Sequence, residues 1–275
     1  MNYIDVHCHL TNEEEYAAIN GVNRVIADAV AAGVKTLVVS GYDLLSSQRA
    51  LSLAEQYENV FFCAGFQSEE LSCYEEDFQK GGNAFSDALG ALKQLLSHPK
   101  CVAVGEIGLD YHFADNPSAA FQREAFVKQL RLADEANLPF VVHSRDACAE
   151  TLALLKENAC FIRRGFLMHC YSYSAECVAD FLSLGAYFSF GGVVTFKKAD
   201  KTKRAALAVP NNRILTETDS PYLTPEPHRG TFPNTPQNVA HTARYLAELR
   251  GENIEDFCED VQKNALSLFP RLSVR

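Results

Sequence analysis

The chain has 275 residues, of which 47% are hydrophobic and 22% are charged, with only 15 glycines and 10 prolines. This composition excludes a disordered or collagen-like chain, and the length suffices for one large α/β domain with a well-buried core. The 35 acidic residues outnumber the 25 Lys and Arg, giving a formal net charge of −10. A protein that coats nucleic acid with its whole surface is expected to be basic, so any such contact here must be local.

The cysteines and the amino-terminal residues indicate a compartment. Nine cysteines are scattered along the chain without a Cys-x-x-Cys pair, a pattern typical of free thiols in a reducing environment. The chain leads from Met1 into residues 3–6 (Tyr-Ile-Asp-Val) without the charged and apolar regions of a signal peptide. No apolar stretch approaches the roughly 18 residues of a membrane span. We therefore expect a cytoplasmic protein that does not enter the membrane.

Short apolar, β-branched runs recur along the whole chain and predict strands. They are residues 3–7, 36–40, 60–64, 101–105, 140–143, 166–169, 186–190 and 214–219. Between them, segments such as 21–33 and 121–137 repeat apolar residues at helical spacing, and 235–250 and 254–269 predict two final helices.

Near-continuous apolar strands that alternate with amphipathic helices indicate a parallel sheet covered by helices. Two closures compete, an open doubly wound sheet and an eight-stranded barrel. The count of eight runs favours the barrel, and no linker, repeat or low-complexity segment divides the chain. We predict a single (β/α)8 TIM-type barrel domain over residues 1–275.

In such sheets the chemistry gathers at the carboxyl ends of the strands. Five of the predicted strands end in side chains that bind metals, namely His7, His9, Glu106, His143, His169 and Asp219. His7 and His9 share one face of their strand, so their two imidazoles can hold one ion. Each residue alone has an ordinary alternative, a core histidine or a helix cap, but five strand ends converging on one rim predict a metal site.

The residue types predict one or two divalent cations, Mg²⁺, Mn²⁺ or Zn²⁺, without deciding among them. Glu106 can bridge two ions. Two cations activate a water molecule, so no Ser or Cys nucleophile is required. We expect Glu106 and Asp219 to take part in catalysis, with Asp219 orienting the attacking water or accepting its proton. Asp5 and Glu217 are predicted to orient the imidazole ligands.

Substrate contacts are predicted from the cations and aromatic residues that follow the strands. Arg145 lies two residues after His143 and suits a bidentate contact with phosphate, and Arg229 follows the eighth strand. Tyr111 is predicted to lie at the same rim, where its ring can stack on an unpaired base. The basic run 197–204 is either a solvated helix face or a contact to the phosphate backbone. Surface salt bridges are the alternative for both arginines.

Four stretches carry a family likeness, residues 5–9 (Asp-Val-His-Cys-His), 105–111, 143–145 and 212–223. On these motifs the sequence resembles the TatD family of metal-dependent deoxyribonucleases, within the amidohydrolase-like hydrolases. The resemblance implies a β/α barrel in which the six residues named above hold divalent metals. It also implies hydrolysis of phosphodiester bonds in DNA, with an exonuclease acting on single strands or ends as the expectation.

The sequence departs from the family pattern in three places. Residues 65–68 read Gly-Phe-Gln-Ser where a histidine segment is usual, so an imidazole is absent from that side of the site. Tyr173 replaces a usual glycine, and we expect its ring to narrow the entrance. Residues 229–230 and 234–236 match only in part. These changes leave the metal ligands intact and bear on substrate preference.

Three functions remain open from the sequence. The first is a metal-dependent nuclease with DNA as its partner, with no obligate protein partner evident. The second is a related barrel hydrolase that cleaves small amides, lactones or phosphoesters. The third is a barrel that binds a metal or a partner without turnover, against which the intact set of six ligands argues.

Overall fold

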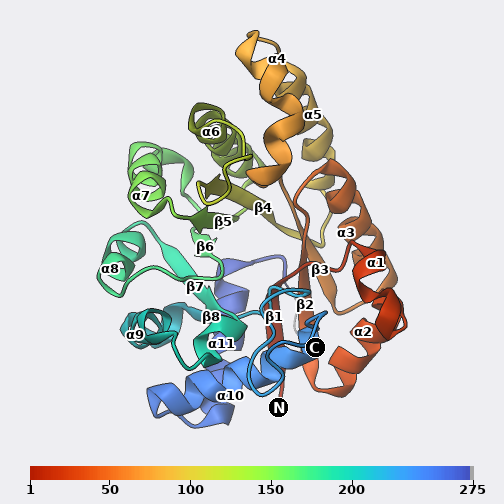
Figure 1. Cartoon of the computed structure of the whole chain (residues 1–275), viewed down its shortest axis with the longest axis vertical. Coiled ribbons are helices and arrows are strands. Elements are labelled where there is room, and N and C mark those ends of the chain that lie inside the picture. Colours follow the sequence, from red (N-terminus) through yellow and green to blue (C-terminus); the bar gives the residue numbers. More distant parts are fainter. Residues whose placement is uncertain (273–275) are drawn as a thin grey trace.

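The protein is described by a computed structural model that covers residues 1–272. Within this range eight parallel strands pair in sequence order to form a nearly closed barrel (Figure 1). The strands are β1 (Tyr3–Cys8), β2 (Val34–Ser40), β3 (Val60–Ala64), β4 (Cys101–Asp110), β5 (Phe140–Arg145), β6 (Phe166–Met168), β7 (Ala186–Phe190) and β8 (Ile214–Thr216). The prediction of an eight-stranded barrel is confirmed.

Helices surround the barrel (Figure 1). They are α1 (Glu13–Tyr16), α2 (Gly21–Ala31), α3 (Leu44–Gln56), α4 (Glu75–Gln79), α5 (Ala84–Leu95), α6 (Ala119–Ala136), α7 (Cys148–Glu157), α8 (Glu176–Ser183), α9 (Asp200–Ala208), α10 (Val239–Arg250) and α11 (Ile254–Leu268). The segments predicted at 21–33, 121–137 and 254–269 correspond to α2, α6 and α11. The segment predicted at 235–250 begins with a short 3₁₀ turn before α10.

Local signals explain where α6 begins and ends. The Ser118 hydroxyl accepts a hydrogen bond from the Phe121 amide at 3.3 Å and caps the first turn. The helix ends at Ala136, because the next residue, Asn137, adopts the left-handed conformation with φ 55°. Between these points Phe126 and Leu130 are buried against the barrel. The apolar face of α6 therefore fixes the helix beside β4, the strand that carries Glu106.

The barrel is filled rather than hollow. The rings of Phe140 and Phe166, paired across β5 and β6, stack with centroids 5.2 Å apart. Phe62, Phe188 and other large rings are also fully buried. Because side chains fill the interior, functional residues can gather only at the barrel ends, here at the carboxyl ends of the strands.

Five strands end at other residues than the predicted runs, and β1 and β5 extend only to Cys8 and Arg145 in place of residues 7 and 143. β4 continues five residues beyond the predicted end at Gly105, whereas β6 and β8 end before His169 and Asp219. Gly108 makes the extension of β4 possible, because its φ is 146° and an added Cβ would lie 1.9 Å from the His143 carbonyl oxygen. The backbone of β4 can therefore run close beside β5 at the level of the candidate site.

Residues 1–272 contain no helix that is both long and apolar enough to cross a membrane. The assignment of residues 1–275 to one domain stays a prediction, and its last three residues lie outside the described range.

Candidate metal centre

All six side chains with predicted metal-binding character converge at the carboxyl ends of the strands. β1 supplies His7, and His9 lies just past it; β4 and β5 supply Glu106 and His143. His169 follows β6, and Asp219 lies in the loop after β8. Their polar atoms form two groups that meet at Glu106.

The first group contains both imidazoles of the His-x-His motif. Nε2 of His7 lies 3.2 Å from Nε2 of His9. Each of these nitrogens lies between 3.4 and 3.6 Å from Oε2 of Glu106 and from Oδ1 of Asp219. Four atoms held tetrahedrally at about 2.1 Å from one ion would lie about 3.4 Å apart. The spacing of the His7, His9 and Asp219 atoms therefore fits a single divalent cation, and Oε2 of Glu106 lies close to both imidazoles.

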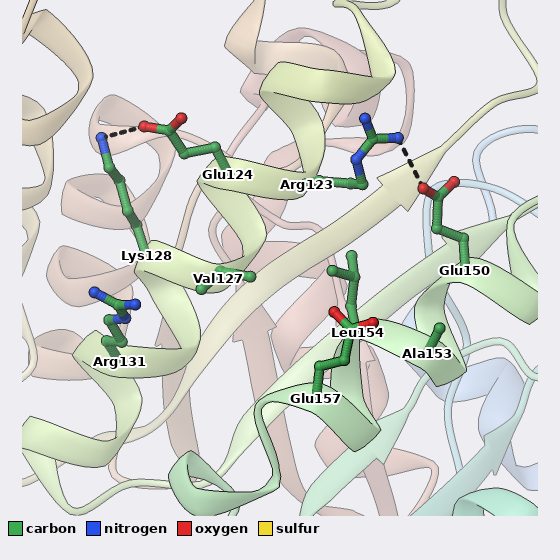
Figure 2. A pocket seen from close by; sticks show the side chains of 9 residues that line it. All are labelled: Arg123, Glu124, Val127, Lys128, Arg131, Glu150, Ala153, Leu154 and Glu157. Atoms are coloured by element: carbon green, nitrogen blue, oxygen red, sulfur yellow. Dashed lines mark hydrogen bonds and ion pairs between the residues drawn. The ribbon is translucent and has the colours of Figure 1, made fainter.

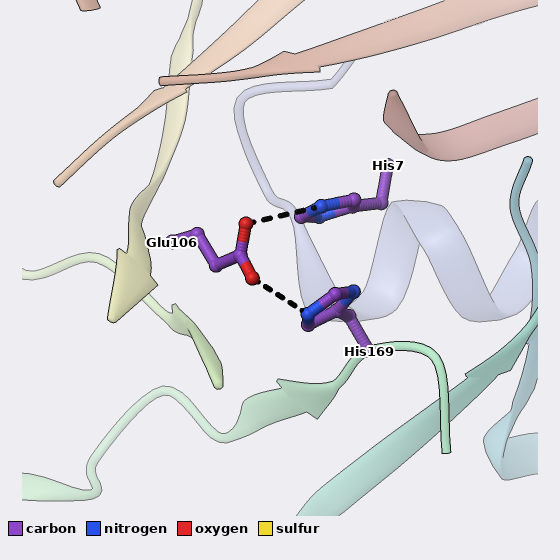
Figure 3. Close-up of side chains that lie close together, drawn as sticks. All are labelled: His7, Glu106 and His169. Carbon is purple, nitrogen blue, oxygen red and sulfur yellow. Dashed lines mark ion pairs between the residues drawn. The ribbon is translucent and has the colours of Figure 1, made fainter. Parts of the chain in front are cut away.

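The second group uses the other oxygen of the same carboxylate. Oε1 of Glu106 lies 2.8 Å from Nδ1 of His143 and 2.8 Å from Nε2 of His169, and the two nitrogens are 3.3 Å apart. Figure 3 shows Glu106 with one oxygen directed to His7 and the other to His169. The carboxylate is thus placed to bridge two ions.

Charge in the centre is concentrated on the two carboxylates. Although burial opposes ionisation, His169 and His143 hold the pKa of Glu106 well below its usual range. Burial likewise opposes ionisation of Asp219, but the hydrogen bond with His9 and the neighbouring imidazoles lower its pKa. Both carboxylates are therefore anionic and available as ligands at neutral pH.

The imidazoles divide into neutral and charged forms. Burial, followed by repulsion from His169, lowers the pKa of His7 to about 4. Burial also disfavours charge on His9, but Asp219 and Glu106 raise its pKa to about 9. The pKa of His143 is raised to about 10 by its carboxylate neighbours, against the effect of burial. A cation that binds here must therefore displace protons from His9 and His143.

Asp110 is a site residue that the sequence reasoning did not identify. Its Oδ2 lies 2.8 Å from Nε2 of His143, and its Oδ1 accepts a hydrogen bond from the His112 amide at 2.8 Å. The side chain is fully buried. Strand alternation could have found it, because Glu106 and Asp110 are four residues apart on β4 and share a face.

The two predicted orienting acids have different surroundings. Oε1 of Glu217 accepts a hydrogen bond from the Cys170 amide at 2.6 Å and lies 3.9 Å from Nδ1 of His169. The predicted contact of Asp5 with an imidazole ring is wrong. Asp5 instead accepts hydrogen bonds from the Thr218 amide at 3.0 Å and the Thr218 hydroxyl at 2.6 Å, and so joins β1 to the loop after β8.

A cavity of about 720 Å³ opens over the metal-binding atoms, and Arg145 lines it as predicted. The Arg145 guanidinium lies 4.8 Å from the centre of the Phe113 ring, which also lines the cavity. Arg229 is not among the described residues that line it, and stacks 4.0 Å from the ring centre of Phe196. Arg145 is therefore the predicted cation that faces the reacting centre directly.

The substrate contact through Tyr111 stays a prediction, and the structure places this residue beside a different hollow. Tyr111 is not among the described residues that line the cavity, and burial and the neighbouring Glu150 carboxylate raise its pKa to about 12. Glu150 belongs to a second hollow of about 620 Å³ between α6 and α7, where it pairs with Arg123 at 2.7 Å (Figure 2). Tyr111 comes directly after the last residue of β4, and its hydroxyl lies near Glu150 and Arg123 of this outer hollow.

Two of the departures from the family pattern can be located. Gln67 lines the cavity in the segment where an imidazole is usual. The Tyr173 hydroxyl lies 2.9 Å from the Ser144 hydroxyl and accepts a hydrogen bond from the Ala147 amide at 3.1 Å. Ser172, not Tyr173, is the neighbour that lines the cavity. The expectation that the Tyr173 ring narrows the entrance is wrong, because its hydroxyl ties the loops after β5 and β6 together.

Backbone strain is concentrated at the same rim. Asp146, Cys170 and Asp219 adopt positive φ values of 53°, 44° and 53°, which side chains other than glycine seldom do. Asp146 follows Arg145, Cys170 follows His169, and Asp219 is itself one of the six converging residues. Strained residues of this kind persist where the surrounding structure holds a functional arrangement in place.

Comparison with known proteins identifies the family. The model of a family described as TatD related DNase matches residues 4–270. The chain belongs to this family. It is 38% identical over 266 residues to YabD of Bacillus subtilis (96% of this chain, 98% of that protein) and 35% identical over 271 residues to YcfH of Escherichia coli K12 (98% and 96%). Both relatives are described as uncharacterized metal-dependent hydrolases.

Solved structures of the TatD family agree with the barrel. YjjV, a TatD homolog from Escherichia coli K12, superposes with a TM-score of 0.84 at 29% identity and covers 98% of each chain. A more distant likeness to the organophosphorus hydrolase from Deinococcus radiodurans, with a TM-score of 0.65 at 13% identity, shows the shared fold alone. The protein is thus a metal-dependent hydrolase of the TatD family.

Proposed function

We propose that this TatD-family hydrolase cleaves phosphodiester bonds in DNA, as an exonuclease that acts on single strands or ends. The observation that carries the proposal is the position of Glu106, whose two oxygens each face a different set of imidazoles. Paired cation positions that share one carboxylate suit the displacement of an oxygen at phosphorus. The family name supports the choice of DNA as substrate.

In this proposal, His7, His9, Glu106 and Asp219 hold one cation, and Glu106, His143 and His169 hold the other. Bound divalent cations would lower the pKa of water and stabilise negative charge on the phosphoryl oxygens. Four imidazoles with two carboxylates suit Zn²⁺ or Mn²⁺, and Mg²⁺ is accepted by the carboxylates.

The remaining roles fall to side chains that reach the cavity. The Asp219 side chain is 14% exposed, lines the cavity and is ionised, so it can accept the proton of an attacking water molecule. Glu106 is 2% exposed, and its two oxygens connect the His7 and His9 imidazoles to those of His143 and His169. Arg145 is exposed at the rim and can pair with a phosphate next to the scissile bond.

The proposal is tested with an end-labelled single-stranded oligonucleotide and Mg²⁺, Mn²⁺ or Zn²⁺, with and without a chelator. We expect progressive shortening that the chelator stops and that Glu106→Ala abolishes. Glu157→Ala, which changes an exposed glutamate of the outer hollow, is the control and is expected to cleave normally. Cleavage that persists with chelator or in Glu106→Ala would contradict the proposal.

One observation favours the second function, hydrolysis of small amides, lactones or phosphoesters. Gln67 offers an uncharged amide to the cavity where the family pattern has an imidazole, which suits a neutral polar substituent. Turnover of a small ester by a preparation that leaves DNA intact would replace the first proposal with this one.

A further inference from the structure

The rim of the cavity is divided by charge. Glu15 of α1 and Glu69 and Glu70, which follow β3, all line the cavity. The Asp43 carboxylate after β2 acts on Glu70 as a neighbouring negative charge. Among the described residues that line the cavity, Arg145 is the single Lys or Arg. The loops after β1, β2 and β3 therefore present an acidic rim, formed by Glu15, Asp43, Glu69 and Glu70.

The end of β5 and the segments after β7 and β8 carry cations that rest on aromatic rings, and the first of them, Arg145, is near enough to Glu69 to act on its carboxylate as a positive charge. The distances from cation to ring centre are 4.8 Å for Arg145 and Phe113, 5.9 Å for Lys201 and Tyr173, and 4.0 Å for Arg229 and Phe196. We call these six residues the cation–aromatic rim. A ring holds its cation in place and offers its other face and edge to a base.

Contacts connect this rim to the cavity wall. The Tyr173 hydroxyl lies 2.9 Å from the hydroxyl of Ser144, which lines the cavity. The Phe196 amide donates to the carbonyl of Val193 at 3.0 Å, and Val193 also lines the cavity. Lys201 is thus linked through the Tyr173 ring to Ser144 of β5, and Arg229 contacts Phe196 in the turn that carries Val193 after β7.

The two rims act oppositely on a polyanion. Phosphates are attracted to Arg145, Lys201 and Arg229, and aromatic rings stack on unpaired bases. Carboxylates repel phosphates within a Debye length of about 10 Å at 0.1 M salt. A strand that crossed the whole cavity would place its phosphates beside Glu69 and Glu70.

We propose that a single DNA strand leaves the metal centre over the cation–aromatic rim, and that the acidic rim prevents it from continuing on the other side. A strand terminus then occupies the centre, and cleavage requires a free end. This inference rests on the proposed nuclease function and adds to it the path of the strand and the residues that impose end dependence.

The first test compares linear and circular single-stranded DNA of one sequence. The variant Glu15→Gln/Glu69→Gln/Glu70→Gln neutralises the acidic rim, and Glu157→Gln/Glu255→Gln/Glu259→Gln removes the same charge from exposed outer positions. We expect the wild type and the control to cleave only the linear DNA, and the rim variant to cleave circular DNA as well. The proposal would be overturned if the wild type cleaved circular DNA. It would also be overturned if circular DNA stayed intact with a correctly folded rim variant.

The second test measures binding apart from turnover. Anisotropy of a nuclease-resistant phosphorothioate oligothymidylate is followed against salt concentration at a fixed Mn²⁺ concentration. Lys201→Ala and Arg229→Ala are each expected to weaken binding and to reduce the salt slope by about 0.7, the value for one phosphate contact of a single strand. Lys35→Ala, an exposed lysine at the start of β2, is expected to bind as the wild type.

The two tests separate the proposals. If linear DNA survives with every metal while Lys201→Ala and Arg229→Ala weaken binding, the nuclease function fails and the strand path stands. If linear DNA is cleaved and both variants bind as the wild type, the strand path fails and the nuclease function stands.

Discussion

The Asp110 carboxylate lies 2.8 Å from Nε2 of His143, on the side of the ring opposite to Glu106. The imidazole is therefore held between two carboxylates, one in each direction. A carboxylate behind a histidine ligand fixes the orientation of the ring and raises its basicity. The pair explains why β4 must continue past Glu106, since Asp110 ends that strand.

Replacing Asp110 with asparagine is expected to weaken the second cation position selectively. Loss of a carboxylate behind a histidine ligand typically costs 10- to 100-fold, that is, about one to two orders of magnitude in metal affinity. Titration calorimetry should show one of two binding steps shifted to weaker affinity and the other retained. Asp115→Asn, an exposed acid in the following loop, is the control. Equal affinities in Asp110→Asn and the wild type would contradict the assigned role.

Metal binding is expected to release protons. His9 and His143 have pKa values raised to about 9 and about 10 by their carboxylate neighbours, so both are protonated in the metal-free protein at pH 7 to 8. Ligation requires neutral imidazoles, so loading both positions should release at least the two protons of these rings, because carboxylate neighbours raise the pKa of His169 as well, and the apparent affinity should rise with pH until these groups titrate. Calorimetry in buffers of different ionisation enthalpy measures this number. Identical heats in all buffers would show that His9 and His143 are neutral before binding.

Gly108→Ala is expected to destabilise the fold. The added Cβ would lie 1.9 Å from the His143 carbonyl oxygen at a φ of 146°, so β4 must move away from β5. Strain of this kind costs about 1–3 kcal/mol, and the movement should also displace His143. Gly90→Ala is the matched control, because no atom lies within 4 Å of its added Cβ in α5 and alanine favours the helix by about 0.5–1 kcal/mol. Urea unfolding compares the two, and equal free energies of unfolding would refute the close approach.

The sequence allowed the six strand-end ligands to be predicted because apolar runs mark the strands and parallel strands end at one rim. The surroundings of Tyr111 were harder to predict, because β4 was expected to end at Gly105, whereas it ends at Asp110 and Tyr111 comes next, beside Glu150 and Arg123. Asp5 was misassigned for another reason. Alternation places Asp5 on the face of His7, but its partner Thr218 is 213 residues away, and only the closed barrel brings them together.

Thr218 links Asp5 to the loop that carries Asp219. Thr218→Val removes the hydroxyl that donates to Asp5 at 2.6 Å and leaves a buried carboxylate oxygen without that partner. We expect the free energy of unfolding to fall by about 1–3 kcal/mol. Metal affinity should fall as well, because the Asp219 amide, next to Thr218, donates a hydrogen bond to the His7 carbonyl.

The matched control is Thr242→Val in α10, since the Thr242 hydroxyl is buried and has no hydrogen-bond partner among the described residues. Its removal should change the free energy of unfolding little and leave metal affinity intact. A Thr218→Val protein as stable as Thr242→Val, with unchanged metal affinity, would show that the Thr218 hydroxyl is not needed to close the barrel between β8 and β1.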